Sequence, residues 1–228
     1  MTIAIMGAMP EEIEPILKRV GSYETVVYAQ NRYFTCKFGT HQLVIAYSKI
    51  GKVFSTLTAA TLIEKFGAEV LLFSGVAGGI NPELGIGDLI VATQLCQHDL
   101  DITAFGHPYG YVPEGAVFIE SDRRLRECAF DVALEMGMTL KEGIIATGDQ
   151  FVASPEKKAW IGKTFHADAL EMEGASVAVV CDALEVPFLV LRAISDTADM
   201  DAGFDFESFL ENSAKRSADF IMNMVETL

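Results

Sequence analysis

Basic residues are scarce in this sequence. Its 228 residues include 17 lysines and arginines against 32 aspartates and glutamates, which gives a formal net charge of −15 at pH 7. Affinity for nucleic acid comes mainly from neutralisation of phosphates by lysine and arginine, and an anionic membrane surface repels a chain of this charge. These numbers disfavour nucleic acid and membrane surfaces as partners.

Long apolar runs and paired cysteines are also missing. No stretch reaches the ~18 apolar residues of a membrane-spanning helix. The first segment, MTIAIMGAMPEE, lacks the basic start and the cleavage site of a secretory signal. The four cysteines form no CxxC pair, which disfavours a zinc ribbon, a redox pair or a disulfide scaffold. We expect a soluble, cytoplasmic protein with reduced thiols.

What the sequence does contain is an alternation of strand-like and helix-like segments, with no linker, repeat or low-complexity tract. We expect strands over residues 2–7, 23–29, 32–38, 42–48, 70–74, 88–97, 143–147 and 187–194. We expect helices over residues 10–20, 52–66, 123–136, 175–184 and 206–228, and another that begins at residue 155. The pattern predicts an α/β fold in one domain, residues 1–228, with a central mixed, mainly parallel twisted sheet flanked by helices on both faces.

Residues 98–118 form a long segment without a clear period, with three glycines, two prolines and four aromatic rings. An ordered loop of this length is usually functional or lies at an interface. His98, Asp99 and Asp101 at its start are residue types that bind metals. No second cluster completes a coordination sphere, so we expect no metal site.

In a sheet of this kind, ligands bind outside the carboxyl ends of the strands. The segments that follow strands are residues 7–12 (GAMPEE), 75–79 (GVAGG), 148–151 (GDQF) and 195–196. Neither GxGxxG nor GxxxxGK[ST] occurs, and the carboxylates of Glu11, Glu12 and Glu14 would repel a phosphate. For Glu11 and Glu14, stabilisation of the helix dipole is the favoured interpretation.

Three further positions carry charge where chemistry could need it. Glu171 and Glu173 share one face if their segment is extended, and the residues alone favour solvated carboxylates. Arg192 lies inside an apolar strand, where an unpaired charge is prohibitive, so it needs a carboxylate, an anionic ligand or water. Asp196 ends that strand, either as a catalytic acid or as the N-cap of the next segment.

An ordered set of segments along the whole chain resembles a known family. The segments are IMGAMPEEIEPI, YSKIGKV, LLFSGVAGGI, DITAFG, ATGDQFV, ALEMEGASVA, PFLVLRAISDTAD and FDFESFL. Together they resemble the 5′-methylthioadenosine/S-adenosylhomocysteine nucleosidases, which belong to the purine nucleoside phosphorylase superfamily. The GVAG, QHD and GDQF variants look most like the subgroup that also hydrolyses 6-amino-6-deoxyfutalosine on a menaquinone route.

The resemblance implies a hydrolase without a cofactor that releases adenine from 5′-methylthioadenosine, S-adenosylhomocysteine, 5′-deoxyadenosine and 6-amino-6-deoxyfutalosine. Asp196 would deliver a proton to purine N7, Glu12 would activate a water, and Arg192 would lie near that water. Glu173 would hold the ribose hydroxyls. The other residues that the resemblance implies for the substrate site are Met9, Ile50, Val76, Ala77, Gly78, Phe151, Val152, Met172, Ser195 and Phe206, with Ile102, Phe105 and Pro113 from the partner subunit of a homodimer.

The implied roles follow the parts of the substrate. Phe151 would stack on adenine, the backbone of Val152 would read its edge, and Met172 would pack on the sugar. The pocket for the 5′ substituent would be lined by Met9, Ile50 and Phe206.

Val76 departs from the family pattern, because many relatives carry a serine whose hydroxyl helps to hold the water. In this chain, that task would fall to Glu12 and Arg192. Two alternatives stay open: a phosphorylase of the same fold, and a nucleoside-binding sensor without turnover. The acidic first turn favours water over phosphate as the nucleophile.

Overall fold

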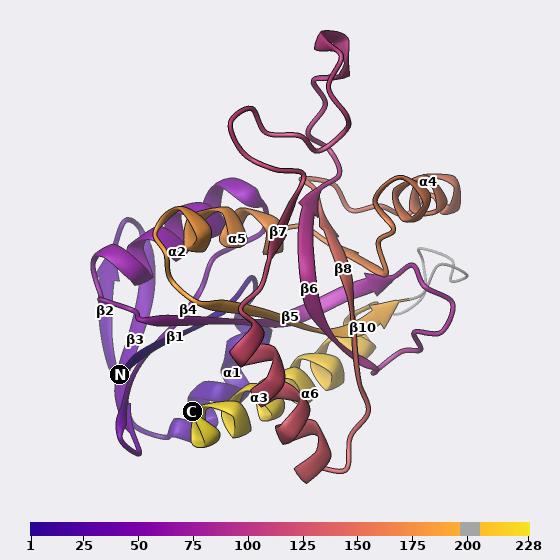
Figure 1. The fold of residues 1–228 in the computed structure, drawn as a ribbon. Coiled ribbons are helices and arrows are strands. Elements are labelled where there is room, and N and C mark those ends of the chain that lie inside the picture. The colour runs from indigo at the N-terminus through magenta and orange to yellow at the C-terminus, as the bar shows by residue number, and fades with distance from the viewer. Residues whose placement is uncertain (197–205) are drawn as a thin grey trace.

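The computed structural model describes residues 1–196 and 206–228, except for the side chains of residues 206–209, and shows a ten-stranded sheet between helices (Figure 1). The strands are β1 (Thr2–Gly7), β2 (Glu24–Tyr28), β3 (Asn31–Phe38), β4 (His41–Tyr47), β5 (Val70–Gly79), β6 (Leu89–Gln97), β7 (Phe118–Glu120), β8 (Leu140–Thr147), β9 (Ala169–Glu171) and β10 (Phe188–Asp196). The helices are α1 (Pro10–Val20), α2 (Lys52–Glu64), α3 (Arg123–Glu135), α4 (Pro155–Phe165), α5 (Gly174–Ala183) and α6 (Phe206–Thr227), with a 3-10 turn η1 (Thr103–Phe105). The expected α/β class is confirmed.

The sheet is mixed, as expected, and is built from two parallel sets. Strands β4, β1, β5 and β10 are parallel neighbours, and so are β6, β8 and β9. Antiparallel pairs β10–β6 and β5–β9 join the two sets, so that β5, β10, β6, β8 and β9 close into a ring. Strands β2 and β3 continue the sheet beyond β4 as the expected antiparallel meander.

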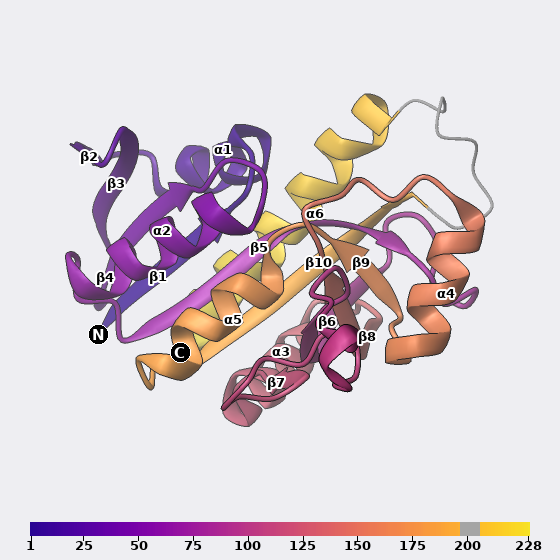
Figure 2. The ribbon, with the colours of Figure 1, turned by 90° about the horizontal axis from the view of Figure 1, so that it is seen from above.

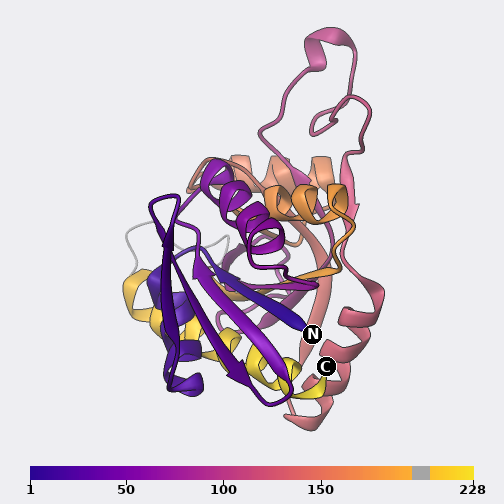
Figure 3. The ribbon, with the colours of Figure 1, turned by 90° about the vertical axis from the view of Figure 1, so that its left-hand side faces the viewer.

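Helices cover both faces of the sheet. Helices α2 and α5 lie on one face, and α1, α3 and α6 lie on the other (Figures 1 and 3). Successive residues of β5 point to opposite faces: Phe73 packs in the core under α2 and α5, and Leu72 packs in the core under α1 and α6. Burial on both faces explains why the central strands read as continuous apolar runs.

The structure corrects the expected boundaries in two places that matter for the site. The GVAGG segment, expected as a turn after a strand, is the end of β5 itself. Residues 169–171 are too few to give a strand signal in the sequence, but they form β9 by pairing with β5 and β8. Such a short strand owes its conformation to its neighbours rather than to local propensity.

The segment between β6 and β7 projects from the body of the molecule (Figures 1 and 3). It contains the turn η1 and corresponds to the long loop expected over residues 98–118. Seen from above, it stands apart from α6 (Figure 2). Among the described helices, none combines the length and hydropathy needed to cross a membrane.

Candidate active site

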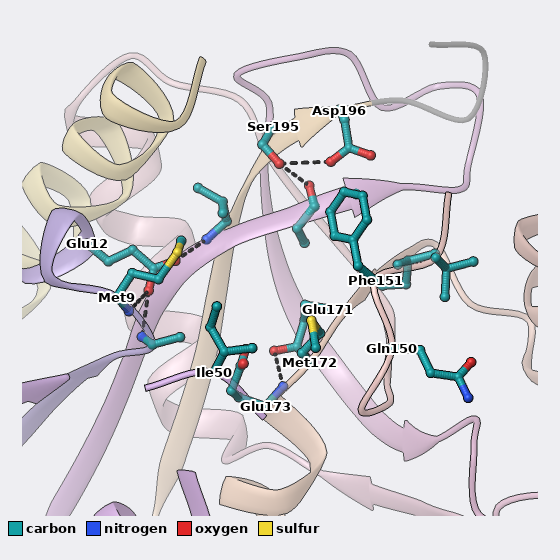
Figure 4. A pocket seen from close by; sticks show the side chains of 16 residues that line it. Met9, Glu12, Ile50, Gln150, Phe151, Glu171, Met172, Glu173, Ser195 and Asp196 are labelled. Carbon is teal, nitrogen blue, oxygen red and sulfur yellow. Dashed lines mark hydrogen bonds between the residues drawn. The ribbon is translucent and has the colours of Figure 1, made fainter. Parts of the chain in front are cut away.

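A pocket lies where the carboxyl ends of β1, β5 and β10 meet β9 and the loop after β8 (Figure 4). It brings together most of the residues that the sequence predicts for the site: Met9, Glu12, Ile50, Val76, Ala77, Gly78, Phe151, Val152, Met172, Glu173, Ser195 and Asp196. Four residues that were not predicted line it as well: Ala8, Gln150, Leu170 and Glu171.

Glu12 lies in the first turn of α1, where backbone N–H groups have no partner within the helix. Its carboxylate accepts hydrogen bonds from the N–H groups of Ala8 (2.5 Å) and Met9 (3.0 Å). The other carboxylate oxygen accepts from the N–H of Val76 at 3.0 Å. Val76 therefore contributes its backbone N–H to the site, and these three bonds hold the Glu12 carboxylate between β1 and β5.

Arg192 has the carboxylate partner that its buried position requires. Its Nη2 lies 2.7 Å from Glu171 Oε2, and its Nη1 donates to the carbonyls of Phe73 (3.2 Å) and Leu191 (3.1 Å). The guanidinium also lies 4.0 Å from the centroid of the Phe73 ring. Arg192 does not line the pocket; it lies behind Gly75, where a Cβ would be 3.3 Å from Nη1.

The expectation that Glu171 and Glu173 are solvated is wrong, because both are buried. Strand β9 ends at Glu171, and Glu173 precedes α5, so the two residues do not belong to one extended segment. Glu171 accepts hydrogen bonds from the N–H of Gly174 and from the Thr147 hydroxyl. Glu173 accepts from the N–H of Gly51 at 2.7 Å. The need of a buried arginine for a carboxylate was the sequence signal that could have identified Glu171.

Burial changes the proton affinity of two of these carboxyl groups. Desolvation raises the pKa of Glu12, and the positive charge of Arg192 and the three backbone N–H groups counteract this rise. Desolvation raises the pKa of Glu173 to about 8, and the nearby Glu171 carboxylate adds to that rise. A raised pKa makes a carboxylate a stronger base, a property that general acid–base chemistry uses.

Asp196 ends β10 on the other side of the pocket. Its Oδ2 lies 3.1 Å from Nζ of the buried Lys158, and its Oδ1 accepts from the Ser195 hydroxyl at 3.0 Å. A Cβ on Gly78 would lie 3.0 Å from Oδ2, so the glycine leaves room for this carboxylate. The N-cap alternative concerns the segment from residue 197, which lies outside the described residues.

The remaining predicted residues lie at the two ends of the pocket or away from it. Phe151 and Val152 lie on the loop after β8, and Met9 and Ile50 lie near Glu12 and Glu173 (Figure 4). The side chain of Phe206 lies outside the described residues. The residues expected from a partner subunit, Ile102, Phe105 and Pro113, lie on the projecting loop and do not line this chain's own pocket.

Figure 4 places Glu12 and Asp196 on opposite sides of the pocket, with Phe151 beside Asp196 and with Met172 and Glu173 below them. Such an arrangement can protonate one end of a bound molecule and activate a water at the other. In the described part of the chain, His, Cys, Asp and Glu side chains form no group of three that could hold a metal ion.

The fold and this site define the class of the protein. Residues 2–226 match the model of the phosphorylase superfamily, and the chain belongs to that superfamily.

Within it, the chain belongs to the nucleosidases. It is 58% identical over 228 residues, the full length of both chains, to the aminodeoxyfutalosine nucleosidase of Campylobacter jejuni. It is 35% identical to the 5′-methylthioadenosine/S-adenosylhomocysteine nucleosidase of Bacillus licheniformis, again over the full length of both. A solved structure of an aspartate-to-asparagine mutant of the Helicobacter pylori nucleosidase, with 5′-methylthioadenosine in its active site, has 50% identity and a TM-score of 0.97, covering 100% of this chain and 99% of that one.

Proposed function

We propose that this enzyme hydrolyses the N-ribosidic bond of adenine nucleosides and releases adenine. The observation that carries the proposal is the placement of two carboxyl groups, Glu12 and Asp196, on opposite sides of one largely apolar pocket. The relatives named above are nucleosidases of this kind, and one of them holds 5′-methylthioadenosine in its active site.

The proposed chemistry needs an acid at the base and an activated water at the sugar. Cleavage leaves an oxocarbenium-like ribose and an adenine anion unless the purine is protonated. In our proposal Asp196 delivers the proton to purine N7, and Glu12 takes a proton from the water that attacks the anomeric carbon. The raised pKa of Glu12 supports its role, because a stronger base accepts that proton more readily.

Other residues hold the substrate in this proposal. Phe151 stacks on adenine, the Val152 backbone reads its edge, and Glu173 accepts hydrogen bonds from ribose hydroxyls. Met172 packs on the sugar. Arg192 acts from behind the pocket wall, since it is bound to Glu171, and its charge favours the ionised form of Glu12.

The substrates that we propose differ at the 5′ end: 5′-methylthioadenosine, S-adenosylhomocysteine, 5′-deoxyadenosine and 6-amino-6-deoxyfutalosine. Met9 and Ile50 line the part of the pocket that would receive this end, with Phe206 as a further proposed contact. An apolar pocket distinguishes ligands by only ~1–3 kcal/mol per methylene, so one site can accept several of them. The 58% identity to an aminodeoxyfutalosine nucleosidase supports the last substrate.

We also propose that residues 1–228 act as one domain and that two chains form a homodimer in the cytoplasm. Helix α2 exposes the apolar side chains of Val53, Phe54 and Leu57. An apolar face of this kind favours burial against another protein surface. All four cysteines are free, which fits a reducing compartment.

The test of the proposal is adenine release in phosphate-free buffer. We expect 5′-methylthioadenosine to yield adenine and free methylthioribose without phosphate. Adenine that appears only after phosphate is added would identify the phosphorylase alternative. Tight binding of an adenosine analogue with no adenine released would identify the non-catalytic sensor.

A further inference from the structure

The base of the projecting loop is attached to two other elements through one carboxylate, that of Asp99. Its Oδ1 lies 2.7 Å from Lys52 Nζ, on the first residue of α2. Its Oδ2 accepts a hydrogen bond of 2.8 Å from the N–H of Asp149, which lies in the loop between β8 and α4 that carries Phe151. Both side chains of the ion pair are largely shielded from solvent, with exposed fractions of 18% for Lys52 and 12% for Asp99.

The start of α2 and the loop that carries Phe151 also meet at the side of the pocket where Glu173 lies. The Asp149 carboxylate accepts from the N–H of Lys52 at 2.7 Å, and the preceding N–H, of Gly51, donates to Glu173. The ring of His98 packs directly against Gly148, where a Cβ would clash with it. We call the loop of residues 148–154, between β8 and α4, the purine-facing loop. The projecting loop, the start of α2 and the purine-facing loop are therefore held by one connected set of contacts.

A second contact joins the projecting loop to the helix that follows the purine-facing loop. The ring of Tyr109 meets Trp160 of α4 edge to face, with 5.0 Å between centroids. Trp160 is the single tryptophan of the sequence. Its fluorescence therefore reports on the position of the projecting loop relative to α4.

From these contacts we propose that Asp99 is a positioning residue that couples the purine-facing loop to the projecting loop. Adenine bound in a chain's own pocket then sets the position of the loop that extends away from it. Asp99 touches no substrate and acts through the backbone of Asp149 and the side chain of Lys52. The proposal rests on the proposed function, because it takes adenine as the ligand of the pocket.

The test combines two measurements. Calorimetry gives the affinity for adenine, and selective excitation of Trp160 gives its fluorescence emission. In the wild-type chain, saturating adenine should change the emission. Asp99→Ala should weaken adenine binding by about tenfold, since a charge-assisted hydrogen bond that positions the purine-facing loop is lost. It should also abolish the emission change at saturation. In turnover, KM for 5′-methylthioadenosine should rise while kcat changes by less than about threefold.

Asp101→Ala is the matched control, because Asp101 lies two residues further on and is hydrogen-bonded to Thr103 alone among the described residues. It should retain wild-type affinity and the wild-type emission change. If Asp99→Ala fails to fold, Lys52→Met removes the same ion pair from the α2 side and should cause the same loss.

The coupling would be overturned if Asp99→Ala bound adenine as tightly as the wild type and showed the same emission change. It would also be overturned if adenine left the emission of the wild-type chain unchanged. A wild-type chain that releases no adenine from 5′-methylthioadenosine would instead contradict the proposed function.

Discussion

At the scale of single residues, three buried carboxyl groups surround the guanidinium of Arg192. Glu171 is paired with it directly, whereas Glu12 and Glu173 interact with it through space. One positive charge does not compensate three negative ones in a site shielded from water, so a proton is held there. Glu173, with its pKa raised to about 8, is the group that holds this proton near neutral pH.

The raised pKa of Glu173 has a consequence for stability. Its proton is bound more tightly in the folded chain than in the unfolded chain, where the pKa is near 4.5. The resulting stabilisation is fully present below about pH 4.5 and is lost as the pH rises to about 8. Glutamine resembles the protonated acid and does not titrate.

We therefore predict that the free energy of unfolding of the wild type falls relative to that of Glu173→Gln between pH 4.5 and about 8. The difference should change by up to about 1.4 kcal/mol per pH unit. Denaturant unfolding at a series of pH values measures it. Glu14→Gln, at an exposed carboxylate, should parallel the wild type; a Glu173→Gln profile parallel to the wild type would contradict the assignment.

Glu12 gives a second prediction at this scale. Glu12→Gln keeps the shape of the side chain but removes the base, so kcat should fall by roughly 10²–10⁴-fold, the range for a positioned proton-transfer group. Asp196→Asn should cause a loss of the same order. Steady-state release of adenine measures both. Glu14→Gln, two residues further along α1, is the control, and near-normal turnover of Glu12→Gln would exclude it as the base.

At the scale of elements, β5 supplies the wall against which Glu12 is held. A Cβ on Gly75 would lie 2.6 Å from Glu12 Oε1, so no other residue fits here without moving the carboxylate. Gly75→Ala should lower kcat by about 10²-fold, since small displacements of a catalytic group have effects of this size. Gly79→Ala on the same strand is the control, because its Cβ would meet Ile194 Cγ2 at an ordinary 3.4 Å.

Measured kcat and thermal unfolding of both variants separate a displaced base from a damaged fold. A folded Gly75→Ala variant with wild-type kcat would show that Glu12 has room to adjust.

Most elements could be predicted from sequence because their signals are local. Apolar runs, Pro10 at the start of α1 and the small-residue pattern of α5 identify strands and helices without any partner. Strand β9 has no such signal, since its three residues are extended only because β5 and β8 flank them. The misjudged burial of Glu171 and Glu173 has the same origin, because their partners lie far away in sequence.

At the scale of the whole molecule, the projecting loop exposes aromatic surface that one chain does not cover. Phe105 at its tip is 81% exposed. If this loop completes the pocket of a partner subunit, Phe105→Ala should raise KM by about tenfold, as for the loss of a well-packed aromatic contact. The variant should leave kcat near the wild-type value.

Steady-state kinetics, which give KM and kcat, and sedimentation equilibrium, which gives the oligomeric state, test this prediction together. Leu134→Ala is the control, because Leu134 is equally exposed, at 81%, but lies on α3. A wild-type chain that is fully active while strictly monomeric would contradict the proposed dimer.

The ring of strands also determines when the enzyme can become active during synthesis. Its closing strand, β10, is the last strand in the described part of the chain and carries both Arg192 and Asp196. A nascent chain that ends before residue 188 leaves β5 and β6 without this neighbour, and unpaired strand edges favour aggregation. The ribosome must therefore deliver more than four-fifths of the polypeptide before the site exists at all. Truncated products would be removed as misfolded chains rather than persist as weak catalysts.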